Sequence, residues 1–273
     1  ILSGGAHANR AMDIQDLLII PTGAKTFTEA LSWIVAVREA AAHLGKVAGH
    51  STNLIADEGG ISIPFKSVDE ACEFVISVIE KVGLTVGDQV GLALDIASTQ
   101  FFDGGKYNLI NINKSYTSEE FVKYINNLVS NQPIISIEDP FAEDDWSAWQ
   151  QFMTIAPKKL QVLGDDLLTT NLDRLNKAID QKSANAILIK ANQNGLVTST
   201  LNVLKQARAN NFNTVVSARS GENEDSWLSD LATGWSAGQI KVGSTHGSER
   251  NAKWNRLLEF EAVEKTKFLN PFN

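Results

Sequence analysis

Short apolar runs that end in charged residues recur along this chain, and they constrain its fold more than any other feature. Each run is rich in β-branched residues and is typical of a buried strand. The runs are at 17–20, 90–94, 133–137, 160–164, 186–189, 214–217 and 239–240. Helical patterns separate most of them. Alternating strands and helices predict a parallel sheet, and this number of units predicts an α/β fold closed into a TIM-type barrel.

Helix starts are marked by a threonine or serine with a glutamate three residues later, which is the pattern of a capping box. The first two such starts, at Thr26 and Ser67, follow one another with no strand run between them. We therefore predict two consecutive helices before the regular units begin. A third start lies at Thr117. Later helices are predicted at 172–181, 196–210, 224–233 and 248–264, and the tail 268–273 is unassigned.

Length and composition narrow the class of protein. The 273 residues suit one barrel of about 250 residues, and we see no linker that would divide residues 1–273 into two domains. The net charge of −8 argues against a nucleic-acid partner, and no apolar run is long enough to cross a membrane. The single cysteine, Cys72, favours a reducing compartment, so we expect a cytoplasmic protein. The start at Ile1 suggests part of a longer polypeptide.

Three carboxylates, Asp95, Glu138 and Asp165, end three successive strand runs. Strand ends of a parallel barrel converge on one mouth, where barrel enzymes keep their chemistry. Three converging carboxylates repel one another unless a cation lies between them, and hard oxygen ligands suit Mg2+. The alternative is that each carboxylate pairs with lysine or arginine across the top of the barrel.

Basic residues end the later strand runs: Lys190, Lys241 and the pair Arg219 and Ser220. A lysine beside a carboxylate-bound metal is suited to act as a general base or to hold an anion. Arginine followed by serine is suited to bind a phosphate or carboxylate. Glu58 precedes two glycines in a loop, which is compatible with a defined position or with a plain surface turn.

In order and spacing, these motifs resemble the barrel domain of enolase, the phosphopyruvate hydratase of glycolysis. The resemblance runs from Gly4 to about Leu258 and covers the segments at 4–8, 57–60, 94–98, 136–141, 164–167, 188–193, 219–222 and 238–241. It implies a barrel that starts β-β-α-α and continues with repeated β-α units. It also implies that Asp95, Glu138 and Asp165 hold Mg2+.

The resemblance further implies roles for the remaining site residues. Lys190 would remove the proton beside the substrate carboxylate, and Lys241 would stabilise the resulting charge. Glu58 would act as general acid on the departing hydroxyl. The pocket and the phosphate site would be lined by His7, Gln15, Arg219 and Ser220.

Three departures from the family pattern stand out. Ala218 occupies the position of an active-site histidine, and alanine cannot transfer a proton. Asp16 replaces a catalytic glutamate and is one methylene shorter, so we expect its hydrogen bond to Glu58 to be lost. The family's amino-terminal capping domain, which helps bind a second metal, is absent from this sequence.

These features support three hypotheses. The first is Mg2+-dependent dehydration of 2-phosphoglycerate, a small phosphorylated carboxylate, to phosphoenolpyruvate by a carbon–oxygen lyase that forms a homo-oligomer at full length. The second, favoured by Ala218 and Asp16, is a degenerate enolase paralogue that binds or scaffolds with little activity. The third is an enzyme of the same superfamily that acts on another carboxylate, against which Arg219 and Ser220 argue.

Overall fold

A computed structural model describes residues 1–272, and its centre is a curled sheet of eight strands. The strands follow the order β1-β2-β3-β7-β8-β9-β10-β11. Their bounds are Leu2–Ser3, Asp16–Ile20, Gly91–Asp95, Ile134–Glu138, Gln161–Gly164, Ala186–Ile189, Asn213–Ser217 and Gly238–Lys241. Each of the seven strands predicted from the sequence is confirmed, with its ends shifted by no more than a few residues.

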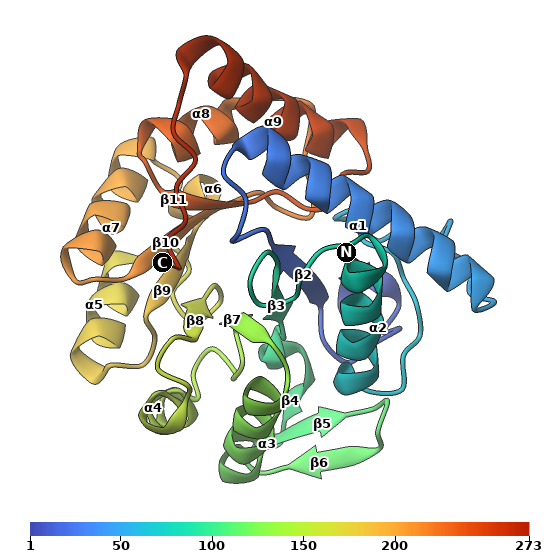
Figure 1. Cartoon of the computed structure of the whole chain (residues 1–273). Coiled ribbons are helices and arrows are strands. Elements are labelled where there is room, and N and C mark those ends of the chain that lie inside the picture. Colours follow the sequence, from blue (N-terminus) through green and yellow to red (C-terminus); the bar gives the residue numbers. More distant parts are fainter. Residues whose placement is uncertain (273) are drawn as a thin grey trace.

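Strand direction divides the sheet into two parts. β1 pairs with β2, and β2 with β3, in antiparallel fashion, whereas β3 and the five strands after it are parallel. Helices lie around the outside of the curled sheet (Figure 1). Their bounds are α1 Phe27–Val47, α2 Val68–Lys81, α3 Ser118–Asn131, α4 Trp146–Ile155, α5 Leu172–Gln181, α6 Ala191–Asn194, α7 Val197–Ala209, α8 Trp227–Gly234 and α9 Ser248–Glu259. The chain is therefore an α/β barrel protein with the predicted β-β-α-α start.

The helix starts follow the sequence signals only in part. Thr26, Ser67 and Thr117 each accept a hydrogen bond from the amide three residues later. The reciprocal bond closes a full capping box only at Thr117 among the residues described. At the first two helices the glutamate bonds instead to the amide one residue before the cap, on Lys25 and Lys66. The two predicted boxes there were half right.

Several short elements were not predicted, and the largest group of them is a small separate sheet. After β3 the chain forms a separate three-stranded antiparallel sheet of β4 (Phe102–Asp103), β5 (Lys106–Leu109) and β6 (Lys114–Tyr116). Its inner residue Tyr107 is fully buried against Phe121 of α3, with ring centroids 4.2 Å apart. This hairpin extension covers the outside of the barrel beside α3 (Figure 1). No helix within residues 1–272 is long and apolar enough to cross a membrane.

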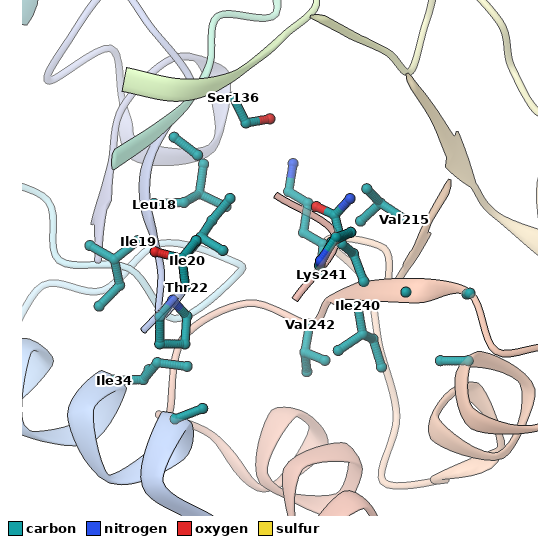
Figure 2. A pocket seen from close by; sticks show the side chains of 18 of the residues that line it. Leu18, Ile19, Ile20, Thr22, Ile34, Ser136, Val215, Ile240, Lys241 and Val242 are labelled. Carbon is teal, nitrogen blue, oxygen red and sulfur yellow. The ribbon is translucent and has the colours of Figure 1, made fainter. Parts of the chain in front are cut away.

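The sheet curls without sealing. Within residues 1–272, β11 pairs only with β10, and no pairing joins it to β1 or β2. A cavity of about 540 Å3 lies in this seam. Leu18 and Ile20 of β2 lie on one side of it, and Ile240 and Val242 lie on the other (Figure 2). The cavity reaches the site residues, because Glu138 and Lys241 also line it.

Candidate active site

Strand register brings the acidic residues into one row. Asp16 lies opposite Asp95 in the β2–β3 pair, and Asp95 lies opposite Glu138 in the β3–β7 pair. All three carboxylate-bearing residues are at least 93% buried. Asp165 follows directly after β8, the next strand along. Because β3, β7 and β8 are parallel, their carboxyl ends meet at one edge, as the sequence predicted.

Lys241 is the cation at the centre of this row. Its ammonium donates to Asp95 at 2.7 Å and to Glu138 at 2.8 Å. Burial alone would lower the pKa of Lys241, but Asp95 and Glu138 raise it well above its ordinary value. Burial and the nearby Asp95 also raise the pKa of Glu138. Lys241 thus compensates the charge of two buried carboxylates, Asp95 and Glu138.

Lys190 makes the second such contact. Its ammonium lies 2.5 Å from one oxygen of Asp165, and both side chains are 13% exposed. Its backbone amide donates to Thr170 at 2.8 Å, which fixes the chain where β9 ends. Lysines thus contact all three predicted metal ligands. This agrees with the alternative interpretation of the sequence, in which each carboxylate pairs with a lysine or arginine.

Among the described residues, one oxygen each of Glu138 and Asp165 has no hydrogen-bond partner. They are Oε1 of Glu138 and Oδ1 of Asp165, and both are buried, as is the unpartnered Oδ2 of Asp16. An unpaired buried carboxylate oxygen is costly unless a cation or water meets it. The donor set is therefore compatible with a divalent cation bound beside the lysines, because hard oxygen ligands suit such ions.

A second acidic group overlaps the first. Ligand atoms of Asp139, Asp165 and Asp166 lie within 4.8 Å of one another and could hold a metal ion. The two oxygens of Asp139, however, already accept the backbone amides of Asp165 and Asp166, at 2.9 and 2.7 Å. Asp139 is buried, and burial together with Asp165 and Asp166 raises its pKa well above the ordinary value. We interpret Asp139 as the residue that orients Asp165.

Glu58 and Asp16 form an acid pair of unequal proton affinity. Burial and the charge of Glu58 raise the pKa of Asp16 to about 8. Burial would also raise the pKa of Glu58, but Lys241 and the hydrogen bond from Ser220 hold it below its ordinary value. Asp16 bonds to Ser3 at 2.5 Å rather than to Glu58, so the expected loss of that bond is what the structure has. Asp16 is therefore the member of this pair with the higher pKa.

The remaining predicted site residues lie around the same mouth. Gln15 donates to Asp95 at 3.0 Å. The hydroxyl of Ser220 donates to Glu58 at 2.8 Å and lies 3.5 Å from the ring of His7. The guanidinium of Arg219 makes no hydrogen bond or ion pair with the described residues, whereas its amide donates to Glu222. Its side chain remains available to an anionic ligand.

Ala218 follows β10 directly and is buried. Its amide donates to the carbonyl of Lys241 at 2.9 Å, so the hydrogen bonding between β10 and β11 continues through this residue. The methyl group offers neither a donor nor an acceptor. This position therefore supplies no proton-transferring side chain.

Sequence reasoning missed two buried basic residues of α9, Arg250 and Lys253. Charged residues in a helix ordinarily face solvent, so their residue types alone gave no reason to single them out. A signal was nevertheless present. Arg250 and Lys253 share helical spacing with Trp254, which is itself buried, and therefore lie on the helix face turned towards the barrel.

The fold and the site together define a class: a mostly parallel α/β barrel whose mouth holds carboxylates neutralised by lysines at the strand ends. A family comparison then gives the specific assignment. The model of the enolase C-terminal TIM barrel domain matches residues 1–268. The chain belongs to this family, which is part of a lyase-type superfamily that is typically metal-dependent.

Proposed function

We propose that this chain carries the site for reversible Mg2+-dependent dehydration of 2-phosphoglycerate to phosphoenolpyruvate. One observation carries the proposal. Lys190 and Lys241 lie within 2.5 to 2.8 Å of Asp165, Asp95 and Glu138, on the ends of separate strands. Such an arrangement places a base and an anion-stabilising cation on either side of a metal-ligating cluster.

Asp95, Glu138 and Asp165 would hold the Mg2+, and the unpaired oxygens of Glu138 and Asp165 support this assignment. Bound there, the ion would supply positive charge that stabilises negative charge developing on a substrate carboxylate. Asp139 would keep Asp165 in place through the amides it accepts. Ligand-supporting contacts of this kind affect metal affinity nearly as strongly as the ligands do.

Lys190 and Lys241 would have different roles in the first step, which is removal of a proton from the substrate. Lys190 would take the proton at C2, beside the substrate carboxylate, and Lys241 would hold the carboxylate oxygens as they gain charge. Lys241 is suited to remain cationic, because Asp95 and Glu138 raise its pKa. A permanent cation stabilises an anion better than a group that exchanges its proton.

Loss of the C3 hydroxyl requires a proton from the opposite side of the pocket. Glu58 would deliver it only after taking up a proton, because Lys241 and Ser220 hold its pKa below the ordinary value. Asp16, whose pKa is raised to about 8, would be the nearby group that holds a proton at this end of the site. Arg219 and Ser220 would bind the phosphate, with His7 and Gln15 lining the pocket. The free guanidinium of Arg219 supports the phosphate assignment.

A second candidate function has its own observation. Ala218 supplies no proton-transferring side chain beside Lys241. The residues proposed to bind metal and phosphate are all present. Under this second candidate function, the protein would bind Mg2+ and phosphoenolpyruvate without converting 2-phosphoglycerate. We keep this candidate second, because both lysines and the three carboxylates are present together.

The experiment compares phosphoenolpyruvate formation from 2-phosphoglycerate, with and without Mg2+, in the protein and two lysine variants. Lys190→Ala removes the proposed base. Lys205→Ala removes an exposed lysine of α7 and serves as the matched control. We expect Mg2+-dependent turnover that survives Lys205→Ala and falls by at least about 10²-fold in Lys190→Ala. Binding of Mg2+ and phosphoenolpyruvate without turnover would support the second candidate instead.

A further inference from the structure

Arg250 of α9 is a buried cation whose terminal nitrogens contact only backbone. Its side chain is 1% exposed. One terminal nitrogen donates to the carbonyls of Arg219 and Val242, at 2.8 and 2.9 Å. The other donates to the carbonyls of Ser220 and Asp57, at 2.7 and 3.1 Å. Four carbonyls thus converge on a single guanidinium.

These carbonyls belong to three segments that are far apart in the sequence. Each segment carries or adjoins a residue of the proposed site: Asp57 precedes Glu58, Val242 follows Lys241, and Arg219 and Ser220 form the proposed phosphate site. The guanidinium therefore contacts the backbone beside the proposed general acid Glu58, beside Lys241, and at the proposed phosphate-binding pair.

The backbone around Arg250 is shaped to receive it. Gly243 has φ of +112°, and a Cβ there would lie 2.7 Å from the carbonyl oxygen of Glu58 and 3.1 Å from Cδ of Arg250. The amide of Ser244 donates to that same carbonyl of Glu58 at 2.8 Å. Glycine is needed here because any side chain would push the Glu58 segment away from Arg250.

A second cation of α9 holds the same region. Lys253 donates to the carbonyl of Asn223 at 2.6 Å and pairs with Glu222 at 2.8 Å. Glu222 in turn accepts the amide of Arg219 at 2.9 Å. The segment after β10 is therefore attached to α9 at two points, and its position depends on how α9 is seated.

We propose that Arg250 is the positioning residue that sets the distances among Glu58, Lys241 and the Arg219–Ser220 pair, an inference that rests on the proposed function. A planar guanidinium has five donors in a fixed fork, whereas an ammonium is a single point. Lysine at this position cannot span the four carbonyls. Misplacement of site groups by about 1 Å costs on the order of 10²-fold in rate.

The test compares Arg250→Lys with Arg256→Lys, which makes the same change on the same helix. Arg256 pairs with Asp230 and Glu259 away from the site. We expect Arg250→Lys to lower kcat for 2-phosphoglycerate by about 10- to 100-fold, whereas Arg256→Lys leaves it unchanged. Hydrogen exchange at the amide of Ser244 should accelerate in the first variant only.

A control separates a local effect from global unfolding. Exchange in α3, at Ile125, should be unchanged, because global destabilisation would accelerate every amide together.

A second variant and a second measurement replace the first ones where these fail. If Arg250→Lys fails to fold, Gly243→Ala disturbs the same contact with the guanidinium present and should give the same exchange pattern. If the parent protein shows no turnover, calorimetric titration with phosphoenolpyruvate replaces kcat, and Arg250→Lys should weaken binding about tenfold. Equal behaviour of Arg250→Lys and Arg256→Lys in exchange and in the ligand readout would overturn the proposal.

Discussion

The ammonium of Lys241 donates to the carboxylate of Asp95 across 2.7 Å, with both groups withdrawn from solvent. The same ammonium contacts Glu138, so one lysine compensates two buried acids. A contact of this kind serves the fold and the chemistry together. Removing one partner leaves buried charge uncompensated, and that cost is large.

The first prediction follows from this contact. Lys241→Met should lower the free energy of unfolding by about 3–5 kcal/mol, because Asp95 and Glu138 lose their cation. Mg2+ should restore part of this loss, since the same carboxylates are its proposed ligands. Denaturant unfolding with and without Mg2+ measures both effects. Stability equal to that of the parent protein would contradict the assigned contact.

The second prediction concerns pH and Asp16, whose pKa is raised to about 8. The pKa of an unfolded aspartate is near its ordinary value of 3.8, whereas the pKa of the folded Asp16 is about 8. Between these values the folded state binds more protons, so the contribution of Asp16 to stability falls as pH rises, by up to about 1.4 kcal/mol per pH unit. Asp16→Asn should flatten this slope. Chemical denaturation from pH 5 to 8 tests it, and identical slopes would contradict it.

The third prediction concerns Asp139, which adopts a positive φ of 41° and accepts the amides of Asp165 and Asp166. Asn tolerates this backbone conformation as aspartate does, so Asp139→Asn chiefly replaces one of the two acceptor oxygens with an NH2 donor and removes one of the two hydrogen bonds. We expect Mg2+ affinity to fall about 10- to 100-fold, because Asp165 loses its support. Calorimetric titration measures the affinity. Asp173→Asn, an exposed change at the start of α5, is the control and should bind Mg2+ as the parent does.

The sequence predicted the barrel strands and their charged ends because both are local signals. A β-branched run that stops at Asp95 or Glu138 marks a strand end without knowledge of its neighbours. Parallel pairing then places those ends together by topology alone. The resemblance to the enolase barrel then supplied an expected role for each of these ends.

Other features depend on contacts that no local pattern encodes. The small sheet at β4–β6 was not predicted, because its strands are short and Tyr107 becomes buried only through its contact with α3. The burial of Arg250 likewise depends on four carbonyls from three distant segments. Pairing of Lys190 with Asp165 was only one of two alternatives, because convergence of charges does not say which groups meet.

The most direct test of the central claim is exchange of the C2 hydrogen of 2-phosphoglycerate with solvent. In deuterium oxide with Mg2+, the protein should incorporate deuterium at C2, followed by nuclear magnetic resonance, and Lys190→Ala should not. This readout isolates proton removal from loss of the hydroxyl, so it succeeds even where Ala218 slows the later step. Deuterium incorporation by Lys190→Ala at the parent rate, or none by either protein with Mg2+ and substrate bound, would contradict the assignment of Lys190 as the base.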